Sequence, residues 1–302
     1  MSDSTQPQGF AFRYCSRGGQ TFAADLSEYH FDLYLDAAAG SAVLDFYRSS
    51  ADQPAVPIGL FSTSVENSTA LRLQELVEQT GLLSLPAAPH DDLGVSLINF
   101  DVWLGGEGMR RIFHAEDMNA LEQLEPLFEA CDSLVAETLQ TPWAAIRLDV
   151  AEVAEADGYH FEMVIENIGN HPLLIADPTA LPGTFEQAAF IQVASYPQAE
   201  SGITALPLNW ERLPLLPPPS SSPVVAGPKP PVCDLRLNPA ERWRGSTATW
   251  KAPQDGGRYL AQAVFLSYLG GADVEGTYRI RGGTFSRGLE FYPELGAEAS
   301  IQ

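Results

Sequence analysis

Apolar and polar residues alternate with a period of two along much of the first part of the chain. Residues 29–36 place large apolar side chains on one side and mainly polar ones on the other, as in a half-buried β-strand. A small-residue turn at 37–41 and a second alternating run predict a hairpin. Residues 96–104 repeat the pattern, and Gly-Gly-Glu-Gly at 105–108 predicts a turn into a return strand at 109–114. We therefore expect an antiparallel sheet here.

Two stretches carry the 3.6-residue period of an amphipathic helix instead. The first runs from about residue 67 to residue 80 and is followed by Gly81, a common helix stop. The second runs from 116 to 137, and Pro126 inside it predicts a kink or a break into two segments. Sheet and helices together predict an α+β domain over residues 1–142. The acids that crowd onto the polar side of the second helix are Glu122, Glu125, Glu129 and Asp132.

Helical periodicity almost vanishes after residue 142, and short strands take its place. Roughly seven strands separated by turn residues are typical of a β-sandwich, which we expect over residues 143–302. Both faces are apolar in residues 259–269, as in a central strand. Eight prolines lie among the nineteen residues 213–231. They disfavour ladder hydrogen bonds and predict an extended loop across the sandwich surface.

The second half resembles the immunoglobulin-like sandwiches that include the intracellular proteinase-inhibitor type. The likeness lies in residues 161–175, where a strand, a turn with Asn and Gly and a return strand follow one another. A Leu-x-Pro-x-Glu segment at 237–243 then precedes Thr-Ala-Thr-Trp at 247–250. The Pro-rich segment departs from the pattern of the family. The resemblance implies a fold and not an activity, and we expect an α+β domain followed by an all-β immunoglobulin-like sandwich.

The charge of the chain is strongly acidic and unevenly divided. There are 39 acidic and 17 basic residues, a net charge of −22. Residues 1–142 hold 21 of the acids and six of the bases, so a net charge of −15 lies in the first half and −7 in the rest. Such a charge repels nucleic acid and anionic membranes and speeds encounter with basic partners. Acidity also favours solubility, and most charge runs are solvated faces.

The three cysteines, Cys15, Cys131 and Cys233, are odd in number, far apart and without CxxC spacing. Neither a disulfide framework nor a zinc site is therefore expected. The first residues lack the basic and apolar regions of a signal peptide, and no apolar run is long enough to cross a bilayer. We expect a soluble, cytoplasmic protein.

The chain contains no GxSxG, P-loop, GxGxxG or HExxH motif, which lowers the expectation of an enzyme. The best remaining cluster is His90, Asp91 and Asp92, with His114 and Glu116 flanking the next strand. Imidazole and carboxylate groups hold a divalent ion where strand pairing brings them together. A His-Asp-Asp loop is more often a solvated turn, so we expect no catalytic residue, no metal and no cofactor.

An acidic two-domain chain without an enzyme motif is similar to the immunity proteins that protect bacteria from their own type VI secretion effectors, particularly nucleases. This resemblance rests on charge, size and architecture. It implies a cytoplasmic inhibitor whose carboxylates meet the basic nucleic-acid cleft of a toxin. The alternative is a non-catalytic adaptor that binds a peptide or sugar through the sandwich loops. The residues expected to bind the partner are Asp91, Asp92, Asp101, Trp103, Glu122, Glu125, Glu129 and Asp132.

Overall fold

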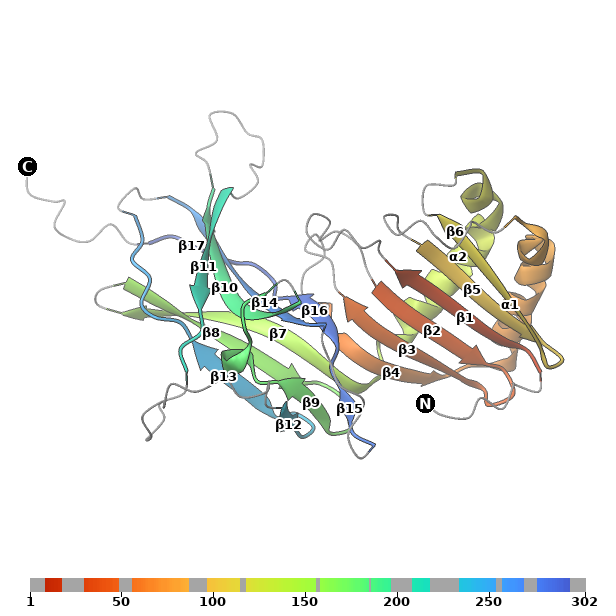
Figure 1. Cartoon of the computed structure of the whole chain (residues 1–302), viewed down its shortest axis with the longest axis horizontal. Helices are drawn as coiled ribbons and strands as arrows, with labels where there is room; N and C mark the ends of the chain where they lie inside the picture. The colour runs from red at the N-terminus through yellow and green to blue at the C-terminus, as the bar shows by residue number, and fades with distance from the viewer. Residues whose placement is uncertain are drawn as a thin grey trace, which may run out of the picture. The chain divides into compact units, whose positions relative to one another are not determined.

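The computed structural model divides the chain into two compact units (Figure 1). The first comprises Met1–Arg48 and Ile58–Ala145, and the second comprises Ser49–Pro57 and Ile146–Gln302. The structure describes residues 9–17, 30–48, 56–86, 97–114, 118–155, 158–184, 186–196, 208–217, 234–253, 257–268 and 276–293.

The first unit is built on an antiparallel sheet of six described strands in the order β4-β3-β2-β1-β5-β6. The two predicted hairpins are confirmed as β2–β3 and β5–β6. In β2 the alternation predicted from the sequence appears as alternating burial, with Phe31, Leu33 and Leu35 buried. The strands are β1 (Ala11–Arg17), β2 (His30–Asp36), β3 (Ser41–Arg48), β4 (Ile58–Ser64), β5 (Leu97–Leu104) and β6 (Glu107–His114).

Two α-helices, among the described residues, cover one face of this sheet. They are α1 (Asn67–Gln79) and α2 (Met118–Thr138), and a short 3-10 helix, η1 (Leu82–Ser84), follows α1. Gly81 lies between α1 and η1 with a φ of 64°, a left-handed conformation that suits glycine and ends the helix as predicted. The second helix is continuous through Pro126, so of the predicted kink or break the break is wrong.

Aromatic side chains join the helices to the sheet. The ring of Phe128 on α2 lies 5.7 Å from that of Phe100 on β5 and 6.1 Å from that of Tyr14 on β1. Phe12 and Phe113 extend this layer on the neighbouring strands and are buried. One face of the sheet therefore forms the core with the helices. The side chains that alternate with these aromatic residues along each strand point to the other face.

The second unit consists of three groups of strands. One is β7-β8-β13, another is β11-β10-β14 with β16 and β17 on the far edge of β14, and the third is β12-β9-β15. The strands are β7 (Pro142–Glu155), β8 (Gly158–Asn167), β9 (Leu173–Ala176), β10 (Gln187–Ser195), β11 (Leu208–Pro214), β12 (Asp234–Leu237), β13 (Arg242–Ser246), β14 (Tyr259–Ser267), β15 (Tyr278–Arg279), β16 (Gly282–Phe285) and β17 (Leu289–Phe291), with a 3-10 helix η2 at Pro178–Ala180.

An aromatic cluster forms the core between the first two groups. The ring of Phe161 on β8 lies 5.4 Å from that of Phe291 on β17, and Trp250 lies 5.9 Å from Phe291. The central strand predicted at 259–269 is confirmed, since β14 is paired along both edges and nearly all its residues are buried. At Thr-Ala-Thr-Trp, residues 247–250, the structure forms isolated bridges at Thr247 and Trp250 rather than a strand.

The predicted fold class is wrong. Strands hold 56% of the described residues and helices 18%, so the protein is mostly β rather than an α+β domain followed by a sandwich. The two helices are long and strongly periodic, and this pattern indicated an α+β class. In the structure they only cover one face of the sheet. The immunoglobulin-like assignment also fails to account for the third strand group, in which β9 pairs with β15 in parallel.

Candidate functional site

The outward side of α2 carries the acidic residues that the helical period predicted. Glu122, Glu125 and Glu129 are exposed, and Glu137 extends the exposed side by two more turns. The opposite side of the helix is buried and packs against the sheet and α1. The buried residues are Leu124, Leu127, Cys131, Leu134, Val135 and Thr138.

These carboxylates have no basic partner within the described part of the molecule. None of Glu122, Glu125 and Glu129 forms an ion pair there. Glu137 lies in the last turn of α2, where its negative charge is close to the negative end of the helix dipole. This turn contains no basic residue that could offset the repulsion. Repulsion between like charges one turn apart also disfavours the helix. The acids therefore do not serve the stability of α2.

A groove runs between α1 and α2 beside these acids. Its volume is about 360 Å³. The residues lining it are Thr69, Arg72 and Leu73 from α1 and Pro126, Glu129, Ala130, Ser133, Leu134 and Glu137 from α2. Small side chains on α2 leave the space open, and Leu73 and Leu134 close its bottom with buried apolar surface. Arg72 faces the same groove, but no ion pair joins it to Glu129 or Glu137.

Asp132 differs from the other acids of α2. Partial burial raises its pKa above that of an ordinary aspartate, although the residue retains solvent contact. Burial, and next the charge of Asp132, raise the pKa of the Tyr14 hydroxyl on β1. Asp132 is thus exposed like the other acids of α2, but it does not line the groove.

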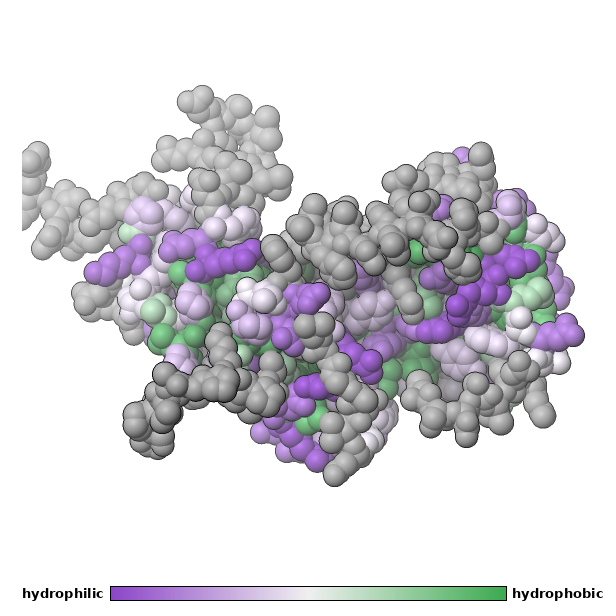
Figure 2. All heavy atoms as spheres, viewed as in Figure 1, coloured by the Kyte–Doolittle hydropathy of each residue, from purple (hydrophilic) through white to green (hydrophobic). Residues whose placement is uncertain are grey.

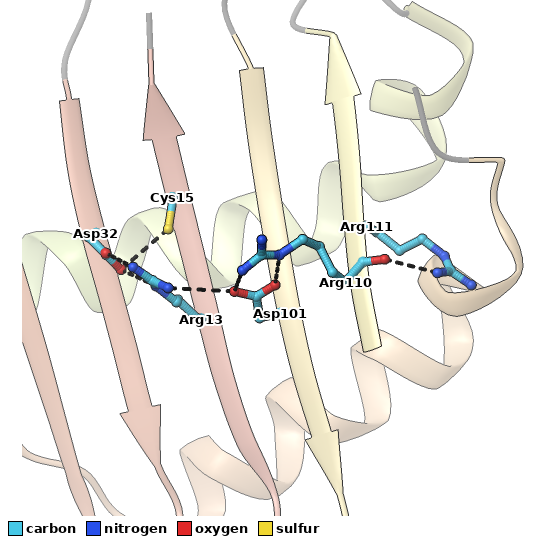
Figure 3. A network of polar contacts seen from close by, with 6 residues as sticks. All are labelled: Arg13, Cys15, Asp32, Asp101, Arg110 and Arg111. Atoms are coloured by element: carbon cyan, nitrogen blue, oxygen red, sulfur yellow. Dashed lines mark hydrogen bonds and ion pairs between the residues drawn. The ribbon is translucent and has the colours of Figure 1, made fainter. Parts of the chain in front are cut away.

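A ladder of alternating charge crosses four neighbouring strands on the other face of the sheet (Figure 3). Arg13 on β1 donates from Nε to Oδ1 of Asp32 on β2 over 2.7 Å, and its Nη1 lies 3.7 Å from Oδ2 of Asp101 on β5. Arg110 on β6 donates to both oxygens of Asp101, over 2.6 and 3.0 Å. The thiol of Cys15 donates to Asp32 over 3.3 Å. We call Asp32, Arg13, Asp101 and Arg110 the charge ladder.

The ladder satisfies its own charges. The hydrogen bond to Asp32 is the main cause of a raised pKa at Arg13, and the hydrogen bond to Asp101 does the same for Arg110. Asp101 is only 7% exposed and lies between two guanidinium groups. The acid expected to attract a partner is thus already neutralised by two arginines. Figure 2 shows hydrophilic side chains gathered over β5 and β6 on this face.

Trp103 lies at the end of the same face. A Cβ atom on Gly108 of β6 would come within 2.8 Å of its Nε1, so the indole covers the glycine. Its ring contacts that of Tyr34 edge to face, with centroids 6.0 Å apart. Trp103 is half-buried and packed against its own sheet, which restricts it as an anchor for a partner.

The structure therefore separates the residues that the sequence grouped into one binding surface. Glu122, Glu125 and Glu129 lie on the helix side of the first unit, whereas Asp101 and Trp103 lie on the opposite face of the sheet. Asp91 and Asp92 lie outside the described residues. The sequence interpretation missed the groove, although Glu137 continues the four-residue spacing of Glu129 and Ser133 and could have been noticed.

The second unit has an opening of its own, with a volume of about 570 Å³. Trp243 on β13 lies in its wall and covers Gly245, where a Cβ atom would come within 2.3 Å of the indole. Leu216, Pro217 and Leu235 add apolar surface, and Asp177, Thr179, Arg244 and Ser246 add polar groups. Leu216 donates its backbone N–H to Ser246 over 2.8 Å, so the first residues of the Pro-rich segment pair with β13. Residues 218–231 lie outside the described part.

Within the described ranges, no group of three His, Cys, Asp or Glu residues is arranged to hold a metal ion. The candidate cluster at His90, Asp91 and Asp92 falls outside them. No helix in those ranges has the length and apolar character to span a membrane. Comparison with protein families, curated proteins and solved structures finds no match to the chain.

Proposed function

We propose that the chain is an inhibitor of the immunity type, which binds and neutralises a basic protein toxin in the cytoplasm. A nuclease effector is the first candidate for that toxin, because nucleases present a basic cleft for nucleic acid. The observation that carries the proposal is the row of exposed carboxylates on α2 that form no ion pair with any residue the structure describes. They are at odds with the stability of the helix that holds them.

The surrounding charge supports the same function. A net charge of −22 accelerates the approach of a basic protein, and unpaired carboxylates form ion pairs without first breaking internal ones. The charge ladder on the other face of the first unit offers no such carboxylates, since its arginines already hold them. The docking face we propose is therefore the outward side of α2, carrying Glu122, Glu125 and Glu129.

The test is affinity capture from the native cell, with the wild-type chain compared to a variant in which Glu122, Glu125 and Glu129 are changed to Lys. We expect the wild type to recover a basic protein in equal amount and the variant to lose it. With that protein in hand, association should slow by about a hundredfold in the variant, and most of the salt dependence should disappear. A variant that binds at the wild-type rate with the wild-type salt response refutes this docking face.

One observation favours a second candidate, a non-catalytic adaptor that binds a peptide or sugar. The opening beside Trp243 offers an aromatic surface with polar groups around it. Trp243→Ala should then abolish ligand capture, while the α2 reversals should have no effect. Retention of binding by Trp243→Ala removes this candidate.

A further inference from the structure

The groove between α1 and α2 has one charged rim and one apolar base. Glu129, Ser133 and Glu137 follow one another at four-residue intervals, so they form a single ridge along the rim. The bottom of the groove is formed by Leu73 and Leu134, with Ala130 of α2 beside them. An occupant of this groove must therefore present cations to one side and an apolar side chain to the bottom.

The spacing of the ridge defines the occupant more closely. Glu129 and Glu137 are eight residues apart, about 12 Å along the helix, which is too far for one cation to contact both. Ser133 lies between them, and its hydroxyl donates back to the carbonyl of Glu129 over 2.7 Å. The position between the two carboxylates is therefore small and uncharged, and its hydroxyl is already used within the helix.

We propose that the groove receives an amphipathic helix of the partner, with basic residues at i and i+7 and an apolar residue at i+4. The two bases are about 10.5 Å apart on one side of such a helix, which matches the two carboxylates, and the apolar residue reaches Leu73 and Leu134. Helices commonly bind by laying an apolar face into a groove of this kind. The inference rests on the proposed function and specifies the partner's contact element.

Charge complementarity decides between this occupant and a second copy of the chain. Among the described residues that line the groove, two are carboxylates and one is an arginine, Arg72, so the groove attracts a net positive charge. The chain itself carries −22 and would repel a second copy.

The probe for the test is a fluorescein-labelled helical peptide on an alanine and glutamine background, with Arg at i and i+7 and Leu at i+4. The control peptide has Arg at i and i+9, which places the two arginines on opposite sides of the helix. Binding to the full chain is followed by fluorescence anisotropy. We expect the first peptide to bind at least about tenfold more tightly than the control.

Ser133→Arg is the decisive variant, because it places a cation between Glu129 and Glu137 at favourable helical spacing. It should weaken binding of the first peptide about tenfold while raising the melting temperature, so that unfolding does not explain the loss. The matched control is Glu78→Gln, an exposed acid of α1 that does not line the groove, set against Glu129→Gln. Only Glu129→Gln should weaken binding.

Several results would overturn the inference. They are equal binding of the two peptides, no effect of Ser133→Arg, and equal losses in Glu78→Gln and Glu129→Gln. A dimer of the chain that Ser133→Arg dissolves, seen by light scattering, would also overturn it. If Ser133→Arg has no effect on the native partner while the reversals at Glu122 and Glu125 still abolish its binding, the groove is refuted and the proposed function stands.

Discussion

The two faces of the first unit hold carboxylates in opposite states. On the open face of the sheet, Asp32 and Asp101 are held by Arg13 and Arg110 in a continuous ladder. On α2, Glu122, Glu125 and Glu129 have no base beside them in the described residues. The same chemical group is thus structural on one face and available for binding on the other.

The position of the few arginines causes this difference. Residues 1–142 contain only six bases, and two of them are used by the ladder. A carboxylate that is partly buried between strands needs a partner, because an unpaired charge there is costly. A carboxylate on an exposed helix remains hydrated and needs none. Acidity therefore accumulates on the helix side, where it remains free to act on another molecule.

The largest expected effect on stability comes from breaking the ladder at its centre. Arg13→Ala leaves two partly buried carboxylates without their shared partner, so we expect the free energy of unfolding to fall by about 2 kcal/mol. Urea unfolding followed by circular dichroism measures this change. Arg13→Lys keeps the charge but loses the paired geometry, so its free energy of unfolding should lie between those of Arg13→Ala and the wild type. A loss below about 0.5 kcal/mol in Arg13→Ala would show that the ladder is an exposed surface pair.

The same neutralisation should have opposite effects on the two faces. Asp101→Asn weakens the contacts with Arg13 and Arg110, and we expect a loss of about 1–2 kcal/mol. Glu129→Gln relieves repulsion with Glu125, and we expect a gain of about 0.2–0.5 kcal/mol. Paired urea titrations of the two variants provide the measurement. Changes of equal sign would contradict the distinction between the faces.

The smallest effect concerns Asp132, whose folded-state pKa is raised by partial burial. The native state then binds more protons than the unfolded state between the two pKa values, so this carboxylate lowers stability as the pH rises through that window. Asp132→Asn should stabilise the protein at pH 7 by well under about 1 kcal/mol, because solvent screens an exposed group. The gain should shrink as the pH falls toward about 4, the pKa of an unfolded aspartate. A gain independent of pH in thermal melts would assign the effect to packing instead.

Much of the first unit could be predicted because its signals are local. The hairpins β2–β3 and β5–β6 follow from alternation and a short turn, and α2 follows from its 3.6-residue period. The strands β12 and β13 were missed because each is only four or five residues long. Runs this short carry too little periodicity to be distinguished from loops.

For the candidate site, too, only the features that depend on local sequence could be predicted. The exposure of Glu122, Glu125 and Glu129 could be predicted, since a helix fixes which residues share a side. The neutralisation of Asp101 could not be predicted, because it depends on Arg13. This residue is 88 positions away in the chain and becomes adjacent only through the pairing of β1 with β5.

By itself, the sequence determined the acidity of the chain, the period of its helices and strands, and the side of α2 on which its acids lie. Only the tertiary structure decided which acids are neutralised and where a groove opens. The side of a helix on which a residue lies depends on residues three or four positions away in the sequence. Ion pairs and grooves form between elements that are distant in the sequence and that the fold brings together. The outward side of α2 was visible in the sequence, and the charge ladder that sets it apart was not.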